Sequence, residues 1–128
     1  MGGSAMETVR TAEAPAAIGP YSQAKRLGQL VFLSGQIPLD PTTGEIVGRD
    51  IESQTVQVLR NIEAILIASG SSFENVVKTT CILDNMADFG TFNTIYAEKF
   101  ISKPARSTLA AKELPRGVLV EIDLIAFI

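Results

Sequence analysis

The sequence predicts an α+β fold, a mixed β-sheet that carries two helices on one of its faces. Apolar residues recur at helical spacing in two segments, one between Asp50 and Gly70 and one between Phe89 and Phe100. The other apolar segments are short and bounded by glycine or proline, as strands are. In chain order the segments are strand, hairpin, helix, strand, helix, strand and strand, which leaves one sheet face without a helix.

The composition is that of one domain. The chain has 128 residues, and we interpret residues 1–5 as an artificial extension and residues 6–128 as the domain. Hydrophobic residues make up 46%, a high share for a lone domain, which indicates that other subunits cover part of the surface. The longest apolar run is interrupted by Glu121 and Asp123, so we expect no membrane partner.

Charge and missing residue types exclude several functions. Eleven basic and fourteen acidic residues give a net charge of −3, which makes nucleic acid an unfavourable partner. Without histidine the chain cannot build a Ser-His-Asp or Cys-His centre. Its single cysteine rules out an internal disulfide, and no Cys/His zinc cluster can form, so we expect no metal and no cofactor. Proton transfer must use Glu, Asp, Lys, Tyr, a hydroxyl or water.

The N-terminal part is predicted to contain an edge strand and a hairpin. Residues 7–12 form the edge strand, and residues 14–22 are a loop that two prolines and a glycine constrain. The loop presents Tyr21, whose simplest interpretation is a ring half packed on the domain with its hydroxyl in water. Residues 22–25 and 30–34 form the hairpin.

The middle of the chain predicts helix, strand and helix. Asp50 is a suitable N-cap for the first helix, and Gly70 ends it. Residues 76–83 form a strand that contains Cys81, which we interpret as a buried structural thiol. The second helix is capped at Asp84-Asn85 or at Asp88.

One face of the second helix is an apolar stripe that belongs to the core. Asn93 lies one position beyond it, where its amide can reach the edge of the core. The stripe consists of Phe89, Phe92, Tyr96 and Phe100.

The last quarter of the chain reads as two strands joined by residues 112–117. In the first strand, Arg106 and Thr108 share one face. In the second, one face is entirely apolar, whereas the other combines apolar residues with Glu121 and Asp123. That second face is too apolar for water and too charged for an ordinary core. A subunit interface or a ligand pocket, containing an arginine and a carboxylate, would resolve this conflict.

Several of these segments together resemble the Rid/YjgF family of imine and enamine deaminases. They occur in order and at compatible spacing over nearly the whole chain from Met6: Gly19-Pro20-Tyr21-Ser22-Gln23, Ser34-Gly35-Gln36-Ile37-Pro38, Val77-Lys78-Thr79-Thr80, the helix from Asp88 to Tyr96, Pro104-Ala105-Arg106-Ser107 and Val120-Glu121-Ile122.

The resemblance implies a fold, an assembly and an activity. The fold would be that of the small trimeric chorismate mutases, in homotrimers with a site in each cleft between subunits. The activity would be hydrolysis of 2-imino acids, such as 2-iminobutanoate and 2-iminopropanoate, to 2-keto acids and ammonia. This removes by-products of pyridoxal-phosphate-dependent enzymes, in the cytoplasm or in an organelle.

The resemblance also implies the site residues. Arg106 would grip the substrate carboxylate with two parallel N–H···O bonds, which a lysine cannot match. Glu121 would hold the attacking water as general base, with a pKa raised by its half-apolar surroundings. Tyr21 and Asn93 match positions near the family's pocket.

The resemblance to the family implies roles for three further residues. The backbone carbonyl at Ser107 would hold the imine nitrogen, and Ser34 and Thr108 are further substrate-binding candidates. Many relatives have cysteine where this chain has Thr108, and the segment 100–104 is a few residues shorter than in many relatives.

Three alternatives remain open. From the residues alone, Arg106 and Glu121 would form an interface salt bridge on neighbouring strands, with no substrate. The resemblance leaves two more: a Rid-like trimer would bind a small carboxylate without turning it over, or the chain would be one of the members with an older label as ribonucleases or translation inhibitors. The negative charge and the missing histidine disfavour RNA cleavage.

Overall fold

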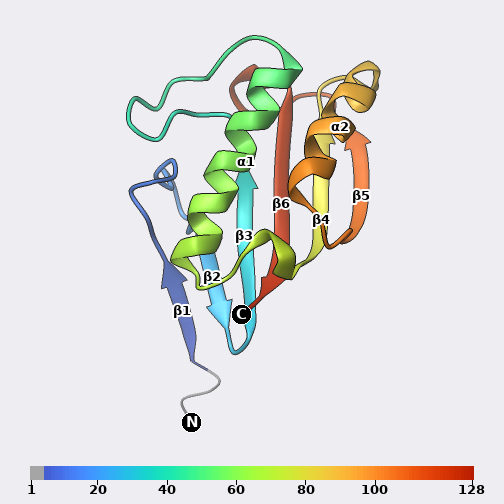
Figure 1. Ribbon diagram of the computed structural model, residues 1–128. Helices are drawn as coiled ribbons and strands as arrows, with labels where there is room; N and C mark the ends of the chain where they lie inside the picture. Colours follow the sequence, from blue (N-terminus) through green and yellow to red (C-terminus); the bar gives the residue numbers. More distant parts are fainter. Residues whose placement is uncertain (1–4) are drawn as a thin grey trace.

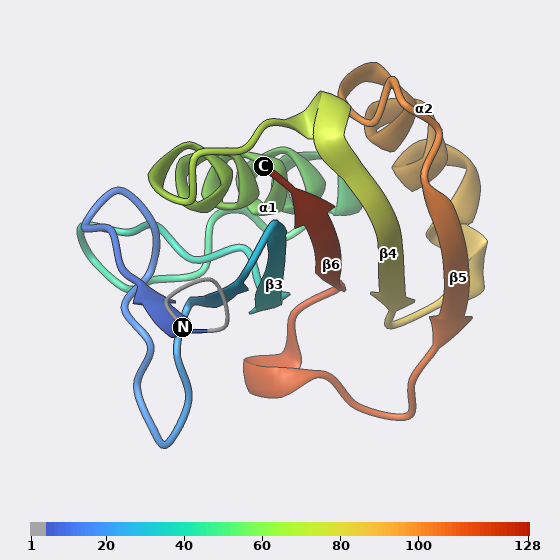
Figure 2. The ribbon, with the colours of Figure 1, turned by 90° about the horizontal axis from the view of Figure 1, so that it is seen from below.

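The computed structural model describes residues 5–128, so the predicted extension lies, apart from Ala5, outside the described residues. A six-stranded mixed sheet carries two α-helices, both on one face (Figure 1 and Figure 2). This confirms the predicted α+β architecture. The elements are β1 (Met6–Val9), β2 (Ala24–Leu27), β3 (Leu30–Gln36), α1 (Ile51–Ala68), β4 (Val76–Leu83), α2 (Phe89–Lys99), β5 (Ala105–Ala110) and β6 (Val120–Phe127).

The strand order is β1-β2-β3-β6-β4-β5. Neighbouring strands are antiparallel except β4 and β5, which are parallel and are connected through α2. The last strand, β6, therefore lies inside the sheet between β3 and β4, and β5 is an edge strand (Figure 1).

The N-terminal strands differ in extent from the prediction. Leu27 pairs with Leu30, so the hairpin closes through two residues, of which Gly28 has φ 59°, and β2 begins two residues later than predicted. The edge strand β1 ends at Val9 rather than at residue 12. The reason is that the backbone of Thr11 bonds the side chain of Gln23 instead of a neighbouring strand.

The ends of α1 match the prediction. The Asp50 side chain accepts a hydrogen bond from the backbone N–H of Ser53 at 2.7 Å. At the other end, Gly70 has φ 82°, and the N–H of Ser71 bonds the carbonyl of Leu66 at 2.8 Å. This is a Schellman termination, which glycine favours.

At the start of α2 the structure selects among the predicted caps. Asn85 accepts a hydrogen bond from the N–H of Ala87 at 2.8 Å and so caps the short turn Met86–Asp88 that leads into the helix. The side chain of Asp88 makes no capping bond.

Among residues 5–128, neither helix is long and apolar enough to cross a membrane.

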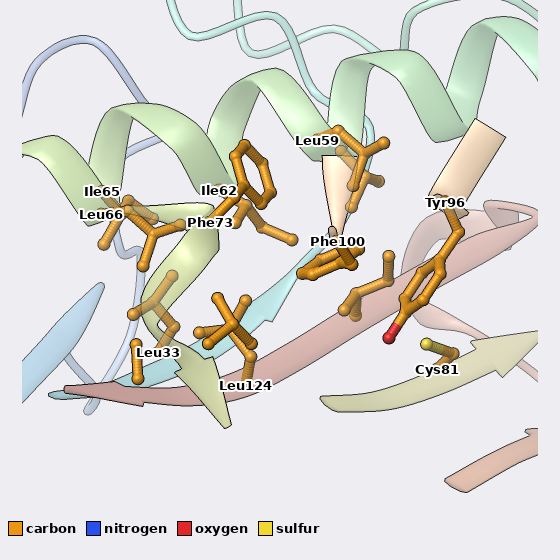
Figure 3. Close-up of a cluster of buried hydrophobic side chains, with 14 of the residues drawn as sticks. Leu33, Leu59, Ile62, Ile65, Leu66, Phe73, Cys81, Tyr96, Phe100 and Leu124 are labelled. Atoms are coloured by element: carbon orange, nitrogen blue, oxygen red, sulfur yellow. The ribbon is translucent and has the colours of Figure 1, made fainter. Parts of the chain in front are cut away.

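The core lies between the two helices and the sheet face below them (Figure 3). As predicted, Phe92 and Tyr96 of α2 and Phe100 directly after it are buried there, and so is Cys81. Phe89, the first residue of the predicted stripe, is partly buried against this core. Burial raises the pKa of the Cys81 thiol to about 11, so the thiol stays protonated and unreactive at neutral pH.

The opposite face of the sheet, which we call the open face, is covered by neither α1 nor α2 (Figure 2). The register places several large apolar side chains there, each at least 40% exposed: Leu30, Phe32, Leu109 and Phe127. An apolar surface of this kind is typical of a protein interaction site.

Candidate active site

Arg106 lies on the helix-covered side of the sheet, at its β5 edge. It pairs with Thr79 of β4, whose side chain is buried under α2. The Arg106 guanidinium donates from Nη1 to Oδ1 of Asn93 at 2.6 Å. Its central carbon lies 4.7 Å from the ring centroid of Tyr96 and 5.5 Å from that of Phe89.

Arg106 is half-buried and has no acidic partner within 4.0 Å among the described residues. Among residues 5–128, the ion pair within 4.0 Å is between Arg26 and Glu7, far along the sheet at the β1–β2 edge. The charge of Arg106 is met instead by two aromatic faces and one amide oxygen. A guanidinium in this environment retains N–H donors for an incoming carboxylate.

Thr108 accompanies Arg106 on the same face, two residues further along β5. Its Oγ1 is buried and has no hydrogen-bond partner among the described residues. Ser107, between them, points to the open face and is exposed. We call Asn93, Arg106 and Thr108, with the rings of Phe89 and Tyr96, the arginine half-site.

Glu121 lies on the open face, on β6. Its carboxylate lies against Gly35, since a methyl group added at Gly35 would overlap the carboxylate oxygen Oε2. Burial raises the pKa of Glu121, and the nearby charge of Asp123 raises it further. The approach is possible because β3 is irregular between Leu33 and Gln36, where the pairing with β6 shifts.

Ser34 belongs to the same irregular segment and connects it to the Tyr21 loop. Its hydroxyl donates to the carbonyl of Ser22 at 2.5 Å. We call Ser34, Gly35, Glu121 and Asp123 the glutamate half-site.

Tyr21 is 54% exposed, as its simplest interpretation expected. It lines a hollow together with Gly19, Ser22 and Gln23, which neither Arg106 nor Glu121 reaches. Tyr21 precedes Ser22, whose carbonyl accepts the hydrogen bond from Ser34 of the glutamate half-site, and no residue of the arginine half-site lines the hollow of Tyr21.

The two half-sites lie on opposite faces of the sheet. In register, Arg106 is level with Thr79 and Leu124, whereas Glu121 is level with Ile82 and Leu109. The side chain of Leu124 is buried under the helices, and successive residues of a strand point to opposite faces. The alternative of a salt bridge between Arg106 and Glu121 on neighbouring strands therefore does not hold within one chain, because β4 separates β5 from β6.

Two residues with structural roles at the site were not singled out from the sequence. Gly35 leaves room for the Glu121 carboxylate. The buried Gln23 side chain accepts from the N–H of Thr11 at 2.8 Å and donates to the carbonyl of Pro15 at 2.8 Å, which fixes the loop before Tyr21. Gly35 and Gln23 both lie in motifs quoted from the sequence, but the role of each depends on contacts with residues far away in the chain.

The chain is similar to known proteins over nearly its whole length. The family model described as endoribonuclease L-PSP matches residues 11–128. A mouse protein named 2-iminobutanoate/2-iminopropanoate deaminase is 47% identical over 94% of this chain and 90% of its own length. The chloroplastic Reactive Intermediate Deaminase A of Arabidopsis thaliana is 51% identical over 94% of this chain and 65% of its own length.

A solved structure shares the fold and holds a small ligand. The Escherichia coli protein TdcF with bound serine has a TM-score of 0.90 and 40% identity, and the match covers 95% of this chain and 98% of that one. Serine carries a carboxylate next to its amine-bearing carbon. A carboxylate is the group that an arginine binds well.

Proposed function

Because the chain belongs to the Rid/YjgF family, whose matching model is described as endoribonuclease L-PSP, we propose that it is a hydrolytic deaminase of 2-imino acids. The proposed substrates are 2-iminobutanoate and 2-iminopropanoate, and the products are 2-keto acids and ammonia. The observation that carries the proposal is Arg106, a half-buried guanidinium with no carboxylate partner among residues 5–128. The proposed setting is the cytoplasm, where a single free thiol such as Cys81 is common.

Arg106 would bind the carboxylate of the substrate. Asn93 occupies one N–H of Nη1, and the N–H groups that remain can form a bidentate pair with a carboxylate. Each charge-assisted bond contributes about 1.5–3 kcal/mol. Thr108, with its unpaired hydroxyl on the same face, would add a hydrogen bond to the bound substrate.

Glu121 would activate the water. The water oxygen attacks the imine carbon, and its proton passes to the Glu121 carboxylate. As the water adds, the C=N π electrons move to the nitrogen, which takes that proton from Glu121 and gives a carbinolamine. Glu121 then carries the hydroxyl proton of the carbinolamine to the amine nitrogen, and the C–N bond breaks as the C=O bond forms, which releases ammonia and a 2-keto acid. Because its pKa is raised, Glu121 can accept a proton and release it again more readily near neutral pH, as this reaction requires.

The active site would be completed by a second copy of the chain. The half-sites lie on opposite faces of one sheet, so an arginine half-site can meet a glutamate half-site only across an interface. The open face, with its exposed apolar side chains, supplies such an interface. A closed homotrimer uses the same contact three times and leaves no unpaired surface.

The test is a coupled imine assay. An amino-acid oxidase generates the imino acid in the presence of semicarbazide, and the remaining imine is followed as semicarbazone. The protein should accelerate imine loss, Arg106→Ala should abolish this and Glu121→Gln should reduce it. Arg60→Ala, a change at an exposed arginine on α1, is the matched control and should leave the rate unchanged.

Two other outcomes would replace the proposal. A carrier would bind 2-oxobutanoate in an Arg106-dependent way in calorimetry but would not change the rate of imine loss, and the serine-bound relative makes this the stronger alternative. A ribonuclease would cleave RNA after rigorous repurification and lose this activity in a site variant; the net charge of −3 opposes it.

A further inference from the structure

Tyr96 lies beneath the one guanidinium that the proposed reaction depends on. The central carbon of Arg106 is 4.7 Å from the Tyr96 ring centroid, within the range of a cation–π interaction. Tyr96 itself is only 7% exposed, so its contact with the guanidinium is largely removed from water. Removal of water strengthens such an interaction.

The ring of Tyr96 is fixed by contacts on several sides. Its hydroxyl is hydrogen-bonded to Oγ1 of Thr79 at 2.7 Å, and Thr79 is fully buried on β4. The ring stacks on Phe100 with centroids 4.2 Å apart and also packs against Phe92. Figure 3 shows the hydroxyl of Tyr96 pointing toward β4, near Cys81.

The same helix supplies a second contact to Arg106. Asn93 precedes Tyr96 by three residues, so both side chains lie on one face of α2. Asn93 accepts an N–H of the guanidinium, and the ring of Tyr96 lies within cation–π distance of its central carbon. Together they restrict both the position and the rotation of the group.

We infer that Tyr96 is a positioning residue: its ring, tethered to Thr79, orients Arg106 so that the free N–H groups meet the carboxylate of the substrate. The inference rests on the proposed function for the identity of the ligand. The sequence pattern places Tyr96 in the core stripe of α2, and the tertiary contacts add the second role.

Substrate kinetics test the role in the assembled protein. Arg106 binds the carboxylate before and during the reaction, so a misplaced guanidinium raises KM more than it lowers kcat. Tyr96→Leu should raise KM about tenfold, the equivalent of about 1.4 kcal/mol, with kcat within about threefold of the wild type. Tyr96→Phe keeps the ring and loses the tether, and its KM should rise by no more than about threefold.

Phe73→Leu is the matched control. It removes a buried aromatic ring of the same core that packs edge-on against Phe100, whereas the cation–π contacts of Arg106 are to Phe89 and Tyr96. It should lower the melting temperature and leave KM unchanged. If Tyr96→Leu and Phe73→Leu have the same KM, Tyr96 is a packing residue only and the inference fails.

A measurement on the wild-type protein needs neither folding of a variant nor turnover. In ¹⁵N-resolved NMR, the guanidinium protons of Arg106 should show nuclear Overhauser contacts to the Tyr96 ring and an upfield ring-current shift. An unshifted Arg106 signal without these contacts would overturn the inference, even if imine hydrolysis is active. If hydrolysis is absent, the proposed function fails. The role of Tyr96 is then still tested by two measurements, the NMR contacts and the Arg106-dependent binding of 2-oxobutanoate.

Discussion

Arg106 and Glu121 lie on opposite faces of one sheet, with β4 between their strands. The arginine is under α2, next to Asn93, and the glutamate is on the open face, against Gly35. A single chain therefore contains both proposed catalytic groups but cannot bring them to one substrate. In the proposed reaction, a second copy of the chain would have to supply the missing group.

The first prediction is complementation between an inactive variant and an impaired one. Arg106→Ala and Glu121→Gln subunits are unfolded together, mixed in equal amounts and refolded. About a quarter of the sites should then combine an intact Arg106 with an intact Glu121 from different subunits, because each position is filled at random. The imine assay should recover about that fraction of wild-type activity.

The control for complementation uses the double variant. Arg106→Ala mixed with a chain that carries both substitutions contains no intact arginine, so its mixture should stay at the level of Arg106→Ala alone. If the first mixture is as inactive as this control, the site is not shared between subunits.

The second prediction concerns Gly35. Gly35→Ala places a methyl group where the Glu121 carboxylate lies, and that side chain must rotate away. Since a misplacement of about 1 Å can cost about 100-fold in rate, we expect kcat for imine hydrolysis to fall at least tenfold. Stability, measured as the urea midpoint, should change little because a side chain rather than backbone moves.

Gly90→Ala is the comparison for this variant. Gly90 lies in α2 with no atom near an added methyl group, and alanine favours a helix over glycine by about 1 kcal/mol. This variant should be as active as the wild type and somewhat more stable. Equal activity of the Gly35 and Gly90 variants would show that Glu121 does not need its observed position.

The third prediction is a pH dependence. Burial raises the pKa of Glu121, and the charge of Asp123 raises it further, so kcat/KM should fall on the acid side at a pH above the ordinary carboxyl range. Asp123→Asn removes one negative charge and lowers the pKa of Glu121. The acid limb should therefore move to lower pH.

The exposed Glu63 on α1 provides the control for this shift. Glu63→Gln removes the same charge far from the glutamate half-site and should leave the profile in place. A limb that stays fixed in Asp123→Asn, or that moves equally in both variants, would mean that Glu121 is not the group that titrates.

The fourth prediction concerns Gln23, which holds the loop before Tyr21. Gln23→Leu leaves the backbone groups of Thr11 and Pro15 without their partner inside the protein. We expect the free energy of unfolding to fall by about 2–3 kcal/mol, as for buried groups that lose several hydrogen bonds. The midpoint of urea unfolding measures this, and imine turnover should fall with it.

Gln29→Leu makes the same chemical change in the exposed hairpin turn. Its side chain makes no hydrogen bond in the described part of the chain, so the free energy of unfolding should change by less than about 0.5 kcal/mol. Similar losses in both variants would contradict the role given to Gln23.

Local patterns predicted much of the fold. The helical spacing before Gly70, the cap at Asp50 and the apolar stripe through Tyr96 depend on residues a few positions apart, and the structure confirms all three. The motif order over the whole chain also indicated the family that the comparisons show.

Strand boundaries were less well predicted. The hairpin register follows from a two-residue turn, and the early end of β1 follows from a bond to Gln23, twelve residues away. Neither is visible in a hydrophobic pattern, because several turns and partners fit the same residues.

The sequence by itself determined which side chains each strand presents together, since alternation along a strand is a local property of the backbone. Thus Arg106 and Thr108 were correctly grouped on one face. Only the tertiary structure decided that β6 lies inside the sheet and that β4 separates it from β5. The physical reason is that strand order arises from long-range hydrogen bonding and burial, and this order places Arg106 and Glu121 on opposite faces.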